Sequence, residues 1–147
     1  MPITPDKMKL YPGGSIRSPE WQAIRKEIGE RSGWECEACK APHGDVICRG
    51  AFKGRAVYML KDGDTFDEET GERLGTFHMD DLRSPRMVTI ILTVAHVDGD
   101  ETNSDRENLR HWCQLHHNRH DAKSRAVNAA RTRRSRLAIA EFFEDET

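Results

Sequence analysis

The sequence has no long hydrophobic run and is poor in apolar residues overall. No stretch of the 147 residues approaches the roughly 18 consecutive apolar positions of a transmembrane helix. The first residues, MPITPDKMKLYPGG, lack the apolar segment of a secretory signal peptide. Only 36% of residues are hydrophobic, whereas 33% are charged. We therefore expect a cytoplasmic protein with a thin core, which a bound metal or a disulfide would need to supplement.

Cysteine is also scarce, with four residues in the whole chain. In the cytoplasm thiols stay reduced, so these cysteines indicate metal binding or free thiols rather than disulfides. Cys36 and Cys39 form a CxxC pair, and Cys113 with His116 forms a CxxH pair. Cys48 stands apart, and it is either a spare thiol or a replacement for His116.

The paired motifs predict one structural zinc site. A two-residue spacer lets the chain turn so that both side chains of a pair point at one ion, and two such pairs supply a closed tetrahedral set. The predicted ligands are Cys36, Cys39, Cys113 and His116, and 74 positions separate the second cysteine from the third (113 − 39). Binding would contribute directly to the stability of the fold. The alternative is that the thiols are free.

A strong excess of either charge is absent, because the net charge is −2. The charges are nevertheless unevenly distributed, with eight acidic residues in the stretch 62–81. Residues 119–136 contain a single acid, Asp121, and seven basic residues: Arg119, Lys123, Arg125, Arg131, Arg133, Arg134 and Arg136. Such a basic segment is typical of binding to a phosphate backbone, although a solvated helix face would look the same.

The predicted secondary structure is of the α+β class, in a single domain over residues 1–147. Ser18-Pro19-Glu20 is a helix-start signal, and Gly33 is the expected end of that helix. Residues 88–97, VTIILTVAHV, are the strongest strand signal, and residues after Leu109 are expected to pair with that strand. A helix should begin near His116. The remaining segments are an irregular arm at 1–17, a β-rich insertion at 50–86 and a basic helical extension with an acidic tail at 122–147.

Four short motifs, in this order, resemble the HNH endonucleases, which have the ββα-metal fold. They are CEAC at 36–39, LTVAH at 92–96, ENL at 107–109 and CQLHHNRHD at 113–121. The similarity is greatest to small HNH proteins of bacteria and their phages and covers about residues 20–125. It implies a ββα-metal core over residues 88–121, stapled by the zinc. The chain has His116 where those proteins have a cysteine.

The resemblance also implies roles for individual residues. His96 is expected to be the general base that takes a proton from water, and Asn108 is expected to orient it. His117 is expected to hold a catalytic Mg²⁺ or Mn²⁺ ion, and Asp121 can join it because positions i and i+4 share a helix face. Many family members have a metal ligand where this chain has Ala95, and close relatives often have a histidine in place of Gly99. Asp98 is the nearest replacement ligand.

These expectations define the predicted function. The chain should be a metal-dependent endonuclease that hydrolyses phosphodiester bonds in double-stranded DNA, by nicking or by cutting both strands. The catalytic residues would be His96, Asn108 and His117, and the basic residues of 119–136 would contact phosphates. One alternative is a zinc-stapled DNA-binding module whose nuclease centre has decayed. Another is a structural or protein-binding zinc domain.

Overall fold

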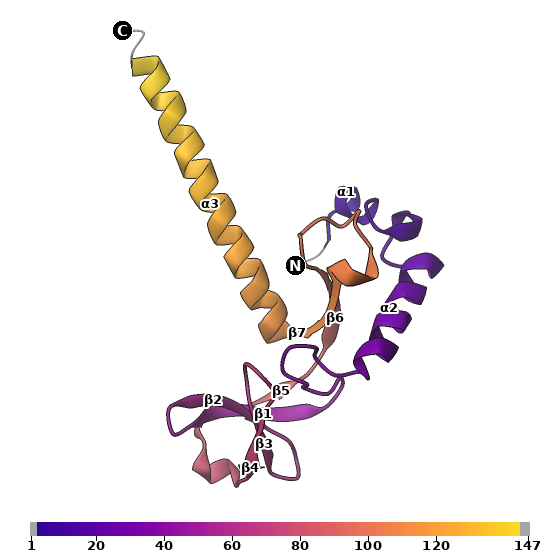
Figure 1. Cartoon of the computed structure of the whole chain (residues 1–147), viewed down its shortest axis with the longest axis vertical. Helices are drawn as coiled ribbons and strands as arrows, with labels where there is room; N and C mark the ends of the chain where they lie inside the picture. Colours follow the sequence, from indigo (N-terminus) through magenta and orange to yellow (C-terminus); the bar gives the residue numbers. More distant parts are fainter. Residues whose placement is uncertain (1–2, 145–147) are drawn as a thin grey trace. The chain divides into compact units, whose positions relative to one another are not determined.

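The computed structural model describes residues 3–144. Its contacts group into two units, Met1–Gln114 and Leu115–Thr147. The described part is a mixed α+β fold, as predicted, with the helices and strands labelled in Figure 1. No helix in the described residues is both long and apolar enough to cross a bilayer.

The N-terminal region is more ordered than the predicted irregular arm. A short helix α1 (Pro5–Met8) is capped by Thr4, and a 3-10 turn η1 (Pro12–Gly14) follows it. Helix α2 (Pro19–Ser32) begins and ends where the sequence predicted. The Ser18 hydroxyl accepts a hydrogen bond from the Trp21 N–H at 3.1 Å, and Gly33 ends the helix in the left-handed conformation.

The apolar face of α2 forms the first core cluster. Trp21, Ile24 and Ile28 are buried together with Leu109, which comes from a strand far along the chain. The half-buried side chains of Tyr11, Ile16 and Val94 pack against this cluster. The N-terminal arm is therefore part of the core, because it covers the apolar side of α2.

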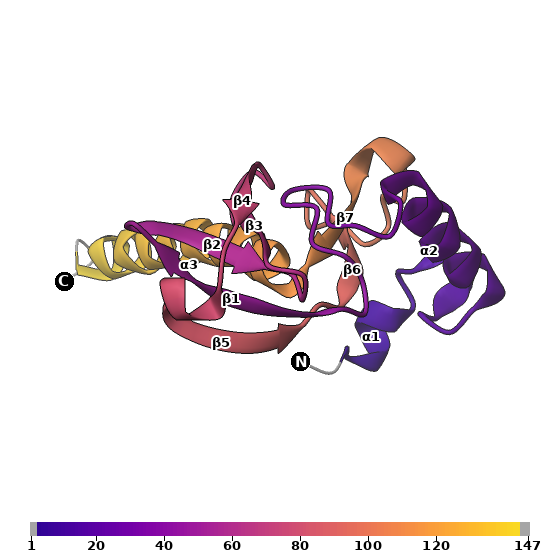
Figure 2. The ribbon, with the colours of Figure 1, turned by 90° about the horizontal axis from the view of Figure 1, so that it is seen from below.

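The predicted β-rich insertion is a five-stranded antiparallel sheet in the order β4-β3-β2-β1-β5 (Figure 2). It is longer at both ends than the predicted range 50–86. Its strands are β1 (Val46–Phe52), β2 (Arg55–Met59), β3 (Asp64–Asp67), β4 (Arg73–Thr76) and β5 (Arg83–Thr89), with the 3-10 turn η2 (Met79–Asp81) before the last. The second core cluster lies in this sheet and consists of Cys48, Val57, Met59 and Leu82.

The prediction of one continuous strand over residues 88–97 is wrong. The chain leaves the five-stranded sheet after β5 and begins strand β6 (Leu92–His96), which pairs with β7 (Leu109–Cys113) in a separate two-stranded sheet. At the break, the backbone of the fully buried Ile90 hydrogen-bonds with Asp45 and Gly44. The Ile91 N–H donates to the Gln114 side chain. These partners end the ladder although the sequence remains strongly strand-forming.

The pairing of β7 with β6 confirms the predicted return of the chain after Leu109. A 3-10 turn, η3 (Arg106–Asn108), precedes β7 and has Asp105 as its N-cap. Helix α3 (Gln114–Glu144) follows β7 directly and begins two residues before the expected position. The second unit consists of this helix, and residues 145–147 of the predicted acidic tail lie outside the described residues.

Candidate metal centre

The chain turns tightly around the first cysteine pair, just after α2. The Cys36 N–H donates to the Ala41 carbonyl at 2.9 Å, and the Lys40 N–H donates to the Cys36 carbonyl at 2.7 Å. Lys40 has a positive φ of 64°, an uncommon value for a residue with a side chain. This closed loop holds the Cys36 and Cys39 side chains on the same side of the turn.

The four predicted zinc ligands lie together. One ligand atom from each of Cys36, Cys39, Cys113 and His116 falls within 4.8 Å of all the others, so this group could hold a metal ion. The three cysteines are no more than 1% exposed. The fourth cysteine, Cys48, packs in the apolar core of the sheet and is not part of the group.

Contacts between the sulfur atoms show how closely this site is built. The Cys39 and Cys113 sulfur atoms are 3.9 Å apart, and the Cys113 backbone N–H donates to the Cys36 sulfur at 3.4 Å. Hydrogen bonding with Cys113 and Cys36, followed by burial, raises the pKa of the Cys39 thiol. The Cys39 thiol, confined in this way, resists becoming a thiolate until a cation is present to share it.

The five-stranded sheet supplies a second layer of contacts around the cysteines. The Arg49 guanidinium donates to the Cys113 sulfur at 3.8 Å and forms a buried ion pair with Glu68 at 3.0 Å. The buried Tyr58 hydroxyl donates to the Cys39 carbonyl. Gly71 approaches the same carbonyl so closely that a Cβ atom there would be 2.6 Å from its oxygen. Sequence reasoning missed these residues, because no motif or spacing links them to the cysteines.

His96 is at the last position of β6 and is only 9% exposed. Its ring stacks on Trp21 with ring centroids 5.6 Å apart, and Tyr11 contacts it edge-on. Burial lowers the pKa of His96, although Glu101 and the other acids of the next loop oppose that effect. Among the residues that the structure describes, none hydrogen-bonds to the buried His96 Nε2 atom.

Asn108 fixes the loop that follows His96. Its backbone carbonyl accepts from the Val97 N–H at 2.8 Å, and its side-chain nitrogen donates to Asp98 and to the Asn103 carbonyl. The hydrogen bonds of its side chain therefore go to the loop, and the expected orientation of His96 by Asn108 stays a prediction. The amide therefore holds the loop that follows the end of β6.

Asp98, the candidate replacement ligand, is engaged within the same loop. One carboxylate oxygen accepts from Asn108 and from the Asp100 N–H, and the other accepts from the Asn103 amide. The hydrogen bond from Asn103 is the largest of the causes that lower the pKa of Asp98. Its present contacts make it a loop-forming residue, and metal binding by Asp98 stays a prediction.

The remaining predicted site residues belong to α3, in the second unit. His117 Nε2 lies 3.4 Å from an Asp121 carboxylate oxygen, as expected for positions i and i+4 of a helix. Arg119 is half-buried. The other six predicted DNA-contacting residues are exposed, namely Lys123, Arg125, Arg131, Arg133, Arg134 and Arg136. The structure therefore confirms the local pairing on α3 and leaves its role as a prediction.

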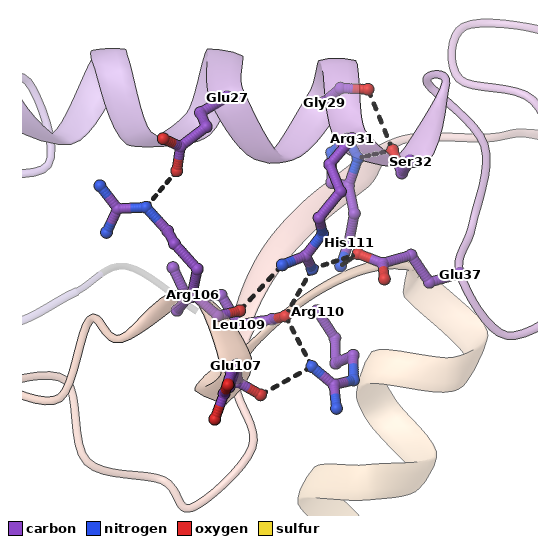
Figure 3. A network of polar contacts seen from close by, with 10 residues as sticks. All are labelled: Glu27, Gly29, Arg31, Ser32, Glu37, Arg106, Glu107, Leu109, Arg110 and His111. Atoms are coloured by element: carbon purple, nitrogen blue, oxygen red, sulfur yellow. Dashed lines mark hydrogen bonds and ion pairs between the residues drawn. The ribbon is translucent and has the colours of Figure 1, made fainter.

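A polar network attaches the end of α2 to the β6–β7 sheet (Figure 3). The Arg31 guanidinium donates to the Leu109 carbonyl at 2.6 Å and pairs with Glu37, whose carboxylate accepts from the His111 N–H. The His111 ring contacts the Ser32 hydroxyl at 2.8 Å. This network fixes the strand that carries Cys113 against the helix that leads to Cys36.

Comparisons with known proteins do not add a family to this description. No protein-family model matches the chain, and neither the curated proteins nor the solved structures contain a match.

Proposed function

We propose that this protein is a metal-dependent DNA endonuclease of the HNH type and that His96 is its general base. The observation that carries the proposal is the buried His96 Nε2 atom, which no described residue engages. A buried polar atom without a partner is costly, and such atoms concentrate where a reacting group or ligand belongs. Because burial lowers the His96 pKa, the ring is neutral near pH 7 and able to accept a proton.

The chemistry requires a base and relief of negative charge. In phosphodiester hydrolysis, His96 would take the proton of the attacking water at Nε2, while Trp21 and Tyr11 hold the ring in place. His117 and Asp121, which lie side by side on α3, would hold the divalent ion. When bound, Mg²⁺ or Mn²⁺ supplies the charge that stabilises the phosphate and the leaving oxygen.

We further propose that the cysteine cluster binds a structural zinc ion. A tetrahedral site with Zn–S bonds of about 2.3 Å places its sulfur atoms about 3.8 Å apart. The Cys39 and Cys113 sulfur atoms are 3.9 Å apart, which supports this identity for the metal. Three thiols and an imidazole form a complete protein ligand set, as in structural rather than catalytic zinc sites.

Cleavage of a supercoiled plasmid in the presence of Mn²⁺ tests the nuclease proposal. The His96→Ala variant should lose about 10²- to 10⁴-fold in rate, the usual effect of losing a positioned base. Its zinc content should be unchanged. The matched control is His78→Ala, because the His78 side chain is 75% exposed and caps the turn η2. If the wild type cuts no substrate with Mg²⁺ or Mn²⁺, or if His96→Ala cuts equally well, the assignment is wrong.

The proposed substrate is DNA, and exposed cations of α3 would bind its phosphates. Log affinity falls as log salt concentration rises. Replacing Arg131, Arg133 and Arg134 with glutamine should make this slope shallower by about 2.7 for duplex DNA (3 × ~0.9). The same replacement at three exposed cations of the first unit, Lys9, Lys53 and Lys61, should leave the slope almost unchanged. Equal slopes in all three proteins would make the basic segment only a solvated helix.

A specific observation supports the second candidate, a DNA-binding module with a decayed nuclease centre. Ala95 cannot bind a cation, and both oxygens of Asp98 already accept hydrogen bonds. That candidate predicts salt-dependent DNA binding with no cleavage under Mg²⁺ or Mn²⁺. The two assays above therefore separate the two candidates.

A further inference from the structure

A small pocket in the first unit is lined by neither His96 nor the cysteines. It has a volume of about 180 Å³ and is lined by residues from α2, from the cysteine loop and from the β6–β7 sheet. Its lining residues are Gln22, Arg25, Lys26, Trp34, His43, Leu92 and His111. Sites for whole drug-sized ligands are larger, at about 300–1,000 Å³. This pocket is therefore of a size for one small ring or one anionic group.

One wall of the pocket is cationic. Gln22, Arg25 and Lys26 are three and four positions apart on α2, so they share one face of the helix. All three are exposed, and Arg25 donates to the Gln22 amide oxygen at 3.4 Å. Within residues 3–144, the structure describes no carboxylate that forms an ion pair with Arg25 or Lys26. Their charges therefore remain available to an anion.

The lining also includes an exposed tryptophan that the backbone holds in place. Trp34 has a positive φ of 58°, and its N–H donates to the Gly29 carbonyl at 2.9 Å. A Cβ atom at Gly29 would be 2.5 Å from the indole ring, so the ring lies where only glycine leaves room. Even so, the Trp34 side chain is 45% exposed. An apolar ring fixed at the surface is a typical platform for stacking.

Two imidazoles complete the pocket, and each has one ring nitrogen already engaged. The His43 Nδ1 atom accepts from the Leu92 N–H at 3.0 Å, so the neutral ring carries its hydrogen on Nε2. The His111 Nδ1 atom contacts the Ser32 hydroxyl, and the ring lies edge-on to Trp34 with centroids 5.7 Å apart. His111 is 3% exposed. The pocket is thus held in shape by α2 and by both strands.

We propose that this pocket binds one unpaired nucleotide of the DNA substrate. The base would stack on Trp34, and the adjoining phosphate would bind Arg25 and Lys26. An aromatic face next to a cationic row is the combination that binds single strands without reading their sequence. Bases stacked within a duplex do not offer a free face to such a ring. The inference rests on the proposed nuclease function, because it names the form of DNA that is presented to His96.

Fluorescence anisotropy with a labelled oligothymidylate of ten nucleotides tests this inference. The Trp34→Ala variant should bind this probe about 5- to 150-fold more weakly, the range expected for one lost stacking contact. Trp34→Phe should recover most of the affinity, because it keeps an aromatic face. Arg25→Ala should weaken binding and reduce the salt slope by about 0.7, the value for one phosphate contact in a single strand.

The controls separate the pocket from general electrostatics and from folding. Lys61→Ala removes one exposed positive charge outside this pocket and should bind the probe as the wild type does. A blunt duplex of the same length should bind Trp34→Ala and the wild type equally well. The inference is overturned if Trp34→Ala and Trp34→Phe both bind the oligomer as the wild type does. It is also overturned if the duplex loses as much affinity as the oligomer does.

Failure of the inference can be distinguished from failure of the proposed function. If oligomer binding depends on Trp34 but the wild type cuts no DNA, the nuclease assignment is contradicted and the pocket assignment stands. If plasmid cleavage depends on His96 but oligomer binding is unchanged in the Trp34 and Arg25 variants, the pocket assignment is wrong and the nuclease assignment stands.

Discussion

The two ends of the β6–β7 sheet differ in the contacts that their buried polar side chains make. At one end Cys113 pairs with Leu92, and the cysteine sulfur atoms there receive hydrogen bonds from the backbone and from Arg49. At the other end His96 pairs with Leu109, and its buried Nε2 has no partner among the described residues. A closed ligand set stabilises a fold, whereas a fixed nitrogen without a protein partner is available for another role.

The largest expected effect comes from removing a ligand of the cysteine cluster. Cys36→Ser should unfold the protein or make it insoluble, because structural zinc contributes about 10–16 kcal/mol in small metal-dependent folds. Circular dichroism together with metal analysis of the purified protein measures both consequences. Cys48→Ser is the matched control, since Cys48 is equally part of the described core but outside the cluster. A folded, zinc-free Cys36→Ser protein would contradict the proposed zinc staple.

A smaller effect should follow from disturbing the layer behind the cysteines. Gly71→Ala places a Cβ atom against the Cys39 carbonyl, and it should weaken zinc affinity about 10- to 100-fold, as other changes behind metal ligands do. Competition with a chelator measures this affinity. Gly54→Ala is the control, because its φ of 79° is similar to the 75° of Gly71 but nothing lies within 4 Å of an added Cβ. Equal zinc affinities in the two variants would contradict a supporting role of this layer in the metal site.

At the His96 end of the sheet, loss of the Asn108 side chain should have a moderate effect. Asn108→Ala removes the side-chain hydrogen bonds to Asp98 and Asn103, so the free energy of unfolding should fall by about 1–2 kcal/mol. Cleavage should slow, while the metal requirement stays the same, because the amide positions the loop next to His96. Urea unfolding and plasmid cleavage measure the two effects. The exposed Asn128→Ala on α3 is the control, and it should change neither.

The smallest expected effect is a shift in pH dependence. His96 acts as a base only when neutral, and burial lowers its pKa from the ordinary 6.5, so the acidic limb of kcat/KM should have a midpoint below 6.5. The same shift disfavours the folded state in acid. The unfolded chain binds the proton more readily, so this contribution to stability is present above pH 6.5 and is lost as pH falls. A midpoint above 6.5 would contradict a buried, neutral base.

The sequence predicted the features that depend on local spacing. Ser18 and Gly33 marked the ends of α2 because capping is a property of a few adjacent residues. The grouping of Cys36 with Cys113 followed from the geometry of the paired motifs. The break at Ile90 was not predictable, because it depends on hydrogen bonds with distant Asp45 and Gly44.

The surroundings of the candidate sites were also hidden from the sequence. Arg49 and Tyr58 meet the cysteines only after the five-stranded sheet has formed. The Trp34 pocket depends on the packing of α2 against two strands. In each case the decisive contact joins residues far apart in the chain, and neither periodicity nor a motif records it.

The position of the five-stranded sheet within the chain has a consequence for the order of folding. All five strands lie between Cys39 and Cys113, and three of their four pairings join consecutive strands. Local hairpins form in about 1–10 μs, whereas closing a longer loop costs more entropy. The sheet can therefore form first and bring its two ends together at the β1–β5 pairing. Cys113 then reaches Cys36 across an already folded segment, so the metal would be captured late.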